Sequence, residues 1–306
     1  MLHQPQLEDH PETHLRAQVI LSRIVERGKR EPWILVKATS ISWLALREVH
    51  DSDYLLALES AGHAGKPFFQ SEDCSLGYDS LDGILAAAGC AVELAQRMSN
   101  GQSGFALTRP PGHHAGIRQA EGFCYLNHTA LAVHEIRKKD PDSKILIVDI
   151  DVHHGNGIEE FFLDDPTTYY LSIHGSPQHL YPWTGQERVR GKGRGEGFTK
   201  NLTLPLGTAG ETWMEAFLRG LAEVKSTFSP DYILVNAGFD AHEEDPYALM
   251  KVKDEHYYQV VDALVELAEK SAKSRIGLML EGGYSLEVLG RLVPEIAARL
   301  SLKYNR

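Results

Sequence analysis

Cysteine, long apolar runs and clustered positive charge are all scarce in this sequence. The 306 residues include only three cysteines, Cys74, Cys90 and Cys124, which are too few and too scattered for a disulfide framework or a cysteine zinc site. We therefore expect a reducing, cytoplasmic setting. No apolar run approaches the roughly 20 residues that span a bilayer. The N-terminal residues also lack the basic and then apolar segments of a secretory signal.

Basic clusters are missing as well. The chain has 42 acidic and 31 basic side chains, a formal net charge of −11, and no block of lysines and arginines. We therefore expect no direct nucleic-acid partner and no membrane contact, whereas an acidic surface is compatible with a cationic substrate. Internal repeats and Pro- or Ser-rich linkers are also absent, so residues 1–306 are expected to form a single domain.

The apolar residues that are present fall into two kinds of segment. Continuous, often β-branched runs are typical of strands buried on both faces, and they occupy residues 104–108, 145–150, 167–173, 232–237 and 276–280. Apolar residues spaced three or four apart predict helices over residues 79–98, 129–139, 212–226, 255–273 and 286–300. This alternation predicts an α/β domain with a mostly parallel central sheet and helices on both faces.

Glycine together with histidine, aspartate or tyrosine follows each predicted strand. The segments read RPPGHHAG, DVHHGNG, HGSP, GFDAH and EGGYS. In open α/β sheets the ligand site lies beyond the carboxyl ends of the strands, and glycine allows sharp turns and close backbone approach there. We therefore expect one pocket surrounded by His113, His114, Asp151, His153, Asp240 and Tyr284.

Asp151 and His153 have the spacing of two metal ligands on one extended segment, because residues i and i+2 point to the same side. Asp240, at the end of another strand, can supply a third ligand and leave an open position for water and substrate, as a catalytic zinc site requires. Oxygen and nitrogen ligands also admit Fe²⁺, Mn²⁺ or Co²⁺. A lone D-x-H segment can also be a capped turn, but the companion loops favour the metal interpretation.

His113 and His114 follow a rigid proline turn, and each has a candidate partner. Two imidazoles beside a metal are suited to proton transfer. Asp149 and Asn156 flank the D-x-H segment, so a carboxylate can support one histidine and an amide the other. Such unequal partners would give the two histidines unequal pKa values and distinct roles.

Aromatic residues follow glycine or precede proline in the same loops. Tyr284, after two glycines, can donate a hydrogen bond to a developing oxyanion. Phe123 follows Gly122, and Tyr181 precedes a proline. Both are candidate walls of a narrow apolar channel, although plain core aromatics would have the same residue types.

Together these segments resemble the zinc-dependent histone deacetylase family, which also includes acetylpolyamine amidohydrolases and bacterial deacetylase-like amidohydrolases. The matching motifs keep the family's order: RPPGHHA (109–115), GFCYLN (122–127), DIDVHHGNG (149–157), SIHGSP with LYPWTG (172–185), NAGFDAH (236–242) and LEGGYS (280–285). The LEGGY and AGFDA spellings and Asn156 are similar to the class II branch, whereas LGYDS (76–80) is more similar to class I.

The resemblance implies the arginase–deacetylase fold and a role for individual residues. One catalytic Zn²⁺ would be bound by Asp151, His153 and Asp240. His114 would be the general base and acid, and the catalytic set implied is His113, His114, Tyr284, Asp149 and Asn156. The acyl-lysine channel would be lined by Gly122, Phe123, Tyr181 and Tyr247. A structural K⁺ would be held by Asp149, Asp151, His153, Ser172 and Ile173.

The resemblance also places charges around the site. Arg16 is similar to the family's arginine of an internal cavity below the zinc, and Glu72 or Asp73 to the rim carboxylate that grips the substrate backbone. Residues 242–245 would make the rim acidic and attract a cationic substrate. Tyr247 stands where specialised polyamine deacetylases carry glutamate, which weakens a polyamine assignment.

The expected function is therefore zinc-dependent hydrolysis of the acetyl amide of acetyl-lysine or a similar acetylated amine. Acetylpolyamines and small acetylated metabolites are alternative substrates. An arginase-like two-metal ureohydrolase would need a further carboxylate where the chain has His154. A silent acyl-lysine binder would not need the intact set of candidate ligands, histidine base and tyrosine.

Overall fold

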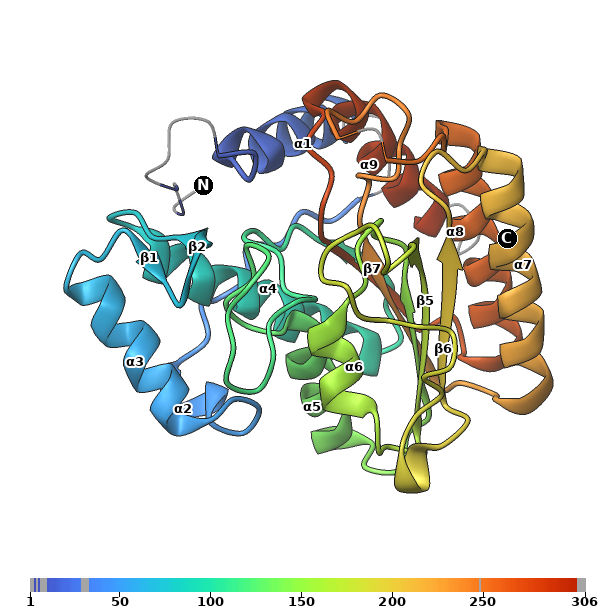
Figure 1. Ribbon diagram of the computed structural model, residues 1–306, viewed down its shortest axis with the longest axis horizontal. Helices are drawn as coiled ribbons and strands as arrows, with labels where there is room; N and C mark the ends of the chain where they lie inside the picture. The colour runs from blue at the N-terminus through green and yellow to red at the C-terminus, as the bar shows by residue number, and fades with distance from the viewer. Residues whose placement is uncertain (1–2, 4, 6–9, 29–32, 248, 302–306) are drawn as a thin grey trace.

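Parallel strands form the central sheet, and five of them coincide with the runs predicted as strands. The computed structural model describes residues 3, 5, 10–28, 33–247 and 249–301 (Figure 1). In this part of the chain the strand order is β3 (Gly104–Ala106), β8 (Ile276–Leu280), β7 (Tyr232–Ala237), β4 (Ile145–Asp149), β5 (Thr168–Gly175) and β6 (Thr199–Leu204). Every neighbouring pair is parallel, which confirms the parallel α/β prediction.

The sequence pattern does not predict β6, the strand at one edge of the sheet. Its residues, TKNLTL, mix polar and apolar side chains, and most of them are only partly buried. An edge strand has one neighbour and need not be apolar on both faces, so it lacks the continuous run that marks the inner strands. β5 also runs on to Gly175 instead of ending at residue 173.

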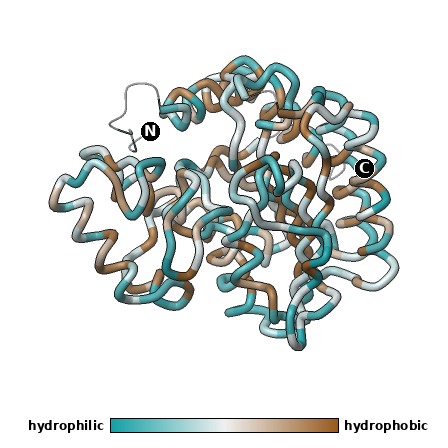
Figure 2. The backbone as a smooth tube through the Cα atoms, in the orientation of Figure 1, coloured by the Kyte–Doolittle hydropathy of each residue, from teal (hydrophilic) through white to brown (hydrophobic). Residues whose placement is uncertain are grey.

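Both faces of the sheet are buried, as the continuous apolar runs indicate. In β4, Leu146 and Val148 belong to one core, and Ile145 and Ile147 belong to a second. The first core contains residues of α1 (His14–Arg27), α7 (Gly210–Thr227), α8 (Asp254–Ser271) and α9 (Leu286–Ser301). The second contains residues of α4 (Ser80–Ser99), α5 (His128–Lys139) and α6 (Asn156–Phe162). Figure 2 shows the hydrophobic residues along the strands and the inner sides of these helices.

The five predicted helices, α4, α5, α7, α8 and α9, are present to within two residues at each end. A further layer near the N-terminus lies outside the predicted elements. It consists of α2 (Trp43–Leu46), α3 (Ser52–His63), β1 (Phe68–Phe69) and β2 (Ser71–Ser75), and it has its own core against α4. The Asp51 side chain caps α3 by accepting hydrogen bonds from the Asp53 and Tyr54 backbone N–H groups. No helix of the described residues is both long and apolar enough to cross a membrane.

The carboxyl ends of the strands lie on one edge of the sheet, since all six strands are parallel. Loops from β3, β4, β5, β7 and β8 therefore start at that edge. The register places Asp149, the last residue of β4, level with Ser172 of β5 and Asn236 of β7. This edge carries the candidate site.

Candidate metal centre

Two loops bring Asp151, His153 and Asp240 together. Asp151 and His153 follow the end of β4, and Asp240 follows the end of β7. One ligand atom from each side chain lies within 4.8 Å of the others. His153 Nδ1 is 3.1 Å from Asp151 Oδ1 and 3.1 Å from Asp240 Oδ2. The proposed ligand set thus converges on one point.

Charge at this point favours a cation. Both carboxylates are buried, and His153 is about one-fifth exposed. Burial and the negative charge of Asp151 raise the pKa of Asp240 to about 7. Burial opposes protonation of His153, but hydrogen bonds to Asp151 and Asp240 prevail and raise its pKa to about 10. Two close, buried carboxylates need a compensating positive charge, and this oxygen and nitrogen donor set fits a divalent metal such as Zn²⁺.

Backbone N–H groups hold the carboxylates in place. Val152 N donates to Asp240 Oδ1 at 2.9 Å, and Gly282 N donates to Asp151 Oδ2 at 2.8 Å. A Cβ atom on Gly282 would lie 2.3 Å from Asp240 Oδ2 and 2.6 Å from Asp151 Oδ2. Only glycine therefore allows the backbone after β8 to pass this close to both carboxylates.

The histidine pair lies beside this centre with the partners expected from the sequence. The rings of His113 and His114 have centroids 4.0 Å apart. His113 Nδ1 is 3.2 Å from Asp149 Oδ2, and His114 Nδ1 is 2.7 Å from Asn156 Oδ1. Burial would lower the pKa of His113, but the negative charges of Asp151 and Asp149 prevail and raise it to about 10. Burial and the charge of His113 shift the pKa of His114 well below its usual value.

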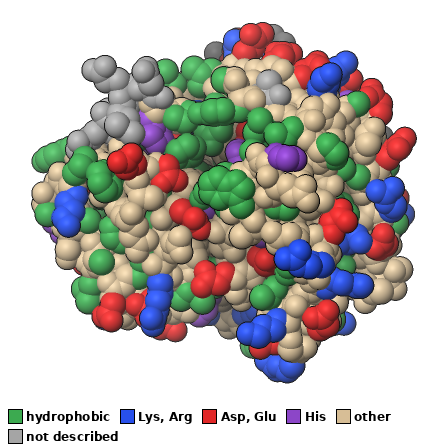
Figure 3. Space-filling model, viewed as in Figure 1, with side chains coloured by type: hydrophobic (Ala, Val, Ile, Leu, Met, Phe, Trp, Pro, Cys, Tyr) green, Lys and Arg blue, Asp and Glu red, His purple; other side chains and the backbone are tan. Residues whose placement is uncertain are grey.

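Aromatic side chains border the histidines. The Tyr181 ring is 5.1 Å from the His114 ring and 6.3 Å from the His153 ring, centroid to centroid. Phe123 packs edge-on against Tyr284 at 6.1 Å, and Tyr247 does so at 5.4 Å. Figure 3 shows hydrophobic side chains and histidines around a hollow on the face in view. The structure thus gathers the aromatic residues predicted to line a channel.

The backbone before Phe123 passes directly over a histidine. Gly122 and Phe123 both have positive φ angles, +57° and +66°. A Cβ atom on Gly122 would lie 2.3 Å from His114 Cδ2. The Asp73 carboxylate accepts the Gly122 N–H at 2.6 Å and also contacts the Ser71 hydroxyl. Asp73 therefore braces this loop, whereas Glu72 is exposed.

Tyr284 is held from two sides. Its backbone N–H donates to Asp245 Oδ2 at 2.7 Å. Arg16 is fully buried, donates through Nε to the Gly283 carbonyl at 2.7 Å, and lies over the Tyr284 ring at 5.0 Å. Burial raises the pKa of Tyr284 well above its usual value, so its hydroxyl stays protonated at neutral pH.

The acidic rim expected over residues 242–245 is weaker than the sequence indicates. Asp245 is turned inward and buried, where it accepts backbone N–H groups. Glu244 forms two hydrogen bonds with Arg291, at 3.0 and 2.8 Å. These two carboxylates are therefore already engaged and do not present free charge to a cationic substrate.

The candidate K⁺ residues lie at the ends of β4 and β5. Asp149 and Ser172 are paired in register, and Ile173 follows Ser172. Asp149 Oδ1 accepts the Asp151 N–H at 3.2 Å, and its Oδ2 lies 3.1 Å from the Tyr170 hydroxyl. His153 follows on the same turn. These residues thus lie at neighbouring strand ends, and their binding of K⁺ stays a prediction.

Two glutamates beside the site are not among the site residues predicted from the sequence. Glu281 is fully buried, and its Oε2 accepts the Gly112 and His113 backbone N–H groups at 2.8 and 3.2 Å. It directly follows β8, so the rule about strand ends could have identified it. Glu121 accepts a hydrogen bond from Asn156 Nδ2 at 2.5 Å. No sequence spacing marks that contact.

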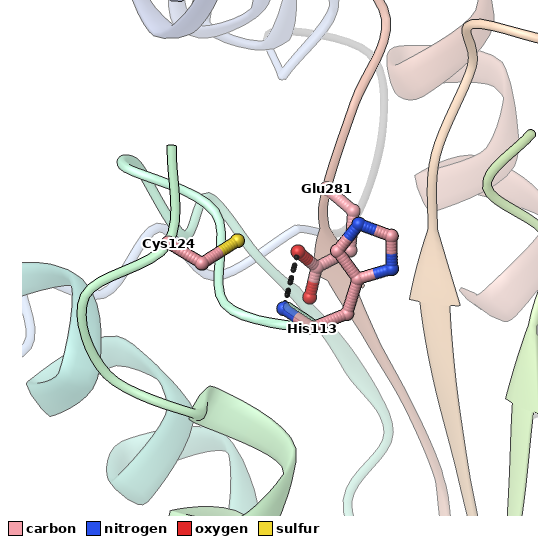
Figure 4. Close-up of side chains that lie close together, drawn as sticks. All are labelled: His113, Cys124 and Glu281. Carbon is pink, nitrogen blue, oxygen red and sulfur yellow. Dashed lines mark hydrogen bonds between the residues drawn. The ribbon is translucent and has the colours of Figure 1, made fainter. Parts of the chain in front are cut away.

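Glu281 also lies in a second cluster of side chains that have the residue types of metal ligands, together with His113 and Cys124 (Figure 4). Figure 4 shows the Cys124 sulfur directed toward the other two side chains. Burial and the charge of Glu281 raise the pKa of the Cys124 thiol well above its usual value. Because a metal-ligating cysteine must be a thiolate, this group suits a metal less well than Asp151, His153 and Asp240.

Known proteins are similar in sequence to this chain over most of its length. Residues 10–300 match the family model described as the histone deacetylase domain. A probable deacetylase of Archaeoglobus fulgidus is 35% identical over 282 residues, covering 91% of this chain and 77% of that protein. Chloroplastic histone deacetylase 14 of Arabidopsis thaliana is 35% identical over 311 residues, covering 94% and 72%. Human histone deacetylase 9 is 33% identical, but the match covers only 30% of that longer protein.

Solved structures share the fold. The HD domain of HDA15 matches with a TM-score of 0.89 and 32% identity, covering 98% of this chain and 85% of that one. An acetylpolyamine aminohydrolase from Burkholderia pseudomallei matches with a TM-score of 0.84 and 26% identity, covering 95% and 91%. Sequence and structure agree, and the chain belongs to the histone deacetylase family.

Proposed function

We propose that the chain is a zinc-dependent deacetylase that hydrolyses the acetyl amide of acetyl-lysine or a similar acetylated amine. The observation that carries this proposal is the convergence of Asp151, His153 and Asp240 beside a buried histidine of low pKa, His114. The rings of His114 and His153 lie 6.1 Å apart. A metal held by the three ligands would therefore sit next to a neutral base.

Asp151, His153 and Asp240 are the residues that would hold one Zn²⁺ per chain. When bound, zinc supplies a Lewis acid that polarises the amide carbonyl and lowers the pKa of water. Backbone N–H groups already orient both carboxylates for this task, so little reorganisation would be needed on binding.

His114 and His113 have different roles, proton transfer for the first and charge stabilisation for the second. His114 is neutral, and its Nε2 is the ring nitrogen not bonded to Asn156. It can take a proton from the attacking water and later give it to the leaving amine. His113, beside Asp149 and Asp151, stays protonated and supplies positive charge next to the developing oxyanion.

Tyr284 completes the site as a hydrogen-bond donor. Its raised pKa keeps the phenol protonated, so it can stabilise the carbonyl oxygen as negative charge develops there. Gly122, Phe123, Tyr181 and Tyr247 would line the entrance. Such an aromatic entrance admits a thin aliphatic chain and removes its water.

Other parts of the proposal concern the surroundings of the site. We infer that Asp149, Asp151, His153, Ser172 and Ile173 hold a structural K⁺ that stabilises the ends of β4 and β5. We further infer that residues 1–306 work as one catalytic domain in the cytoplasm, with acetylated amines as substrate partners. The family membership of residues 10–300 supports the single catalytic domain.

Acetylpolyamines are a second candidate substrate class. The structural likeness to the acetylpolyamine aminohydrolase favours them. Glu244 is paired with Arg291, Asp245 is buried, and Tyr247 carries no charge at the rim, so these three residues offer a polycation less negative charge than the sequence indicates. A two-metal ureohydrolase is disfavoured because His154 contacts Thr184 and Glu159 instead of offering a further carboxylate to the centre.

Direct comparison of substrates tests the proposal. Purified enzyme is assayed with an acetyl-lysine peptide and with N-acetylputrescine, with and without a chelator, and Asp240→Asn serves as the inactive control. We expect chelator-sensitive hydrolysis of the peptide and its loss in the variant. Preference for N-acetylputrescine would move the assignment to polyamines, and no hydrolysis of any acetylated amine would refute the proposed function.

A further inference from the structure

A carboxylate stands behind the amide that contacts His114. Glu121 Oε1 accepts a hydrogen bond from Asn156 Nδ2 at 2.5 Å, and Asn156 Oδ1 lies 2.7 Å from His114 Nδ1. Glu121 is itself anchored by reciprocal backbone hydrogen bonds with Cys124, at 3.2 and 2.9 Å. A continuous path of hydrogen bonds therefore runs from His114 through Asn156 to Glu121.

The two histidines of the pair are supported differently. His113 contacts the Asp149 carboxylate directly at 3.2 Å. His114 is separated from its carboxylate by a neutral amide. An amide alone could turn either its oxygen or its nitrogen toward a histidine, because the two ends have almost the same shape. The carboxylate behind Asn156 removes that freedom.

The direction of each hydrogen bond follows from donor chemistry. A carboxylate only accepts hydrogen bonds, so the Asn156 NH₂ group must face Glu121. The Asn156 oxygen must then face His114, and Nδ1 of His114 must be the donor. A neutral imidazole has one N–H, so Nε2 is left with its lone pair.

We propose that Glu121 is a positioning residue that acts through Asn156 to fix the His114 proton on Nδ1. It thereby keeps Nε2 of His114 free to accept a proton. Its importance for turnover rests on the proposed function, whereas its effect on the tautomer does not. If the amide turned round, its NH₂ group would donate to Nδ1, the proton would move to Nε2, and His114 could not act as a base there.

Nuclear magnetic resonance tests this inference without an activity assay. Long-range ¹H–¹⁵N spectra of the zinc-loaded, ¹⁵N-histidine-labelled protein report which ring nitrogen carries the proton, and the His114→Ala variant identifies the signals. We expect the Nδ1–H form in the unmodified protein. In Glu121→Gln the amide can face Asn156 either way, so we expect the Nε2–H form to appear.

A swap variant separates positioning from a general loss of structure. In Glu121→Gln combined with Asn156→Asp, the new glutamine can donate to the new aspartate, which accepts from His114 Nδ1. We expect this double variant to recover the Nδ1–H form. Glu135→Gln is the matched control, because Glu135 also accepts a carboxamide hydrogen bond, from Gln96 at 2.8 Å, but this exposed pair joins α5 to α4 and involves no residue of the candidate site.

Kinetics give a second readout on an acetyl-lysine peptide. We expect kcat to fall about tenfold or more in Glu121→Gln, as loss of a correctly protonated general base would require, with KM little changed and partial recovery in the swap. A rise in KM alone would assign Glu121 to substrate binding and overturn the inference.

Three spectroscopic results would overturn it as well: an Nε2–H form in the unmodified protein, an unchanged tautomer in Glu121→Gln, or a swap that fails to restore Nδ1–H. If the unmodified enzyme hydrolyses no acetylated amine, the proposed function fails. The tautomer then still decides whether Glu121 positions His114.

Discussion

Asp245 Oδ2 accepts the backbone N–H of Tyr284 at 2.7 Å, although the two residues are 39 positions apart in the chain. The same oxygen lies 3.3 Å from Ser285 N, and Oδ1 accepts the Tyr247 N–H at 3.1 Å. Both carboxylate oxygens therefore act as acceptors inside the protein. This aspartate ties the loop after β7 to the loop that carries Tyr284.

Replacing Asp245 by asparagine should loosen Tyr284. The new NH₂ group would face backbone donors, so at least one buried N–H would lose its acceptor, at a cost of about 1–3 kcal/mol of unfolding free energy. We also expect a lower kcat, because Tyr284 would be less well positioned. Chemical denaturation and peptide deacetylation check both effects. Glu244→Gln, at the surface pair with Arg291, is the control, and equal behaviour of the two variants would contradict this role.

Removing the Tyr284 hydroxyl should slow the reaction without releasing the metal. Tyr284→Phe keeps the ring that packs against Phe123 and Tyr247 but lacks the donor to the oxyanion. By comparison with the loss of one oxyanion-hole donor, we expect kcat to fall on the order of a hundredfold. Zinc content, measured by elemental analysis, should match that of the unmodified protein. Full activity in this variant would exclude Tyr284 from the mechanism.

Acid should destabilise the fold partly through His128. Burial lowers the pKa of His128 to about 4, whereas in the unfolded chain the imidazole has its ordinary pKa of 6.5. As the pH falls from 6.5 toward 4, the unfolded chain gains a proton that the folded protein excludes. The unfolding free energy should therefore fall on the order of 1 kcal/mol per pH unit from this residue.

Urea unfolding at several pH values between 6.5 and 5 measures this contribution. His128→Gln can still donate to the Pro110 carbonyl, which His128 Nε2 contacts at 2.9 Å, but it cannot take up a proton. Its stability should depend less on pH than that of the unmodified protein. The exposed His63→Gln serves as the control, and parallel pH dependence in all three proteins would rule out the contribution.

The inner strands and two of the three proposed metal ligands follow from local sequence patterns. Continuous apolar runs mark strands buried on both faces, and Asp151 and His153 are two residues apart on one turn, so short-range geometry already relates them. Asp240 follows a different strand. Its place beside them is predictable only because parallel strands bring their carboxyl ends to one edge.

Three other features depend on contacts that no local sequence pattern encodes. They are helix α1, the inward side chain of Asp245 and the contact between Glu121 and Asn156. Helix α1 escapes prediction because one of its few buried residues is Arg16, whose charge is compensated by the buried Glu12 at 3.2 Å. Pattern rules place such charged residues on the surface. Residues 242–245 are expected to form an acidic rim, yet Asp245 turns inward to backbone donors. Glu121 meets Asn156 across 35 positions of sequence.

The most direct test of the central claim is a zinc titration of the metal-free protein, followed through both metal binding and peptide deacetylation. We expect activity to rise linearly and to reach its maximum at one equivalent of Zn²⁺ per chain. Asp240→Asn should bind zinc at least tenfold more weakly, roughly in line with the loss of an oriented carboxylate. Full activity without metal, a requirement for two equivalents, or unchanged zinc affinity in Asp240→Asn would contradict it.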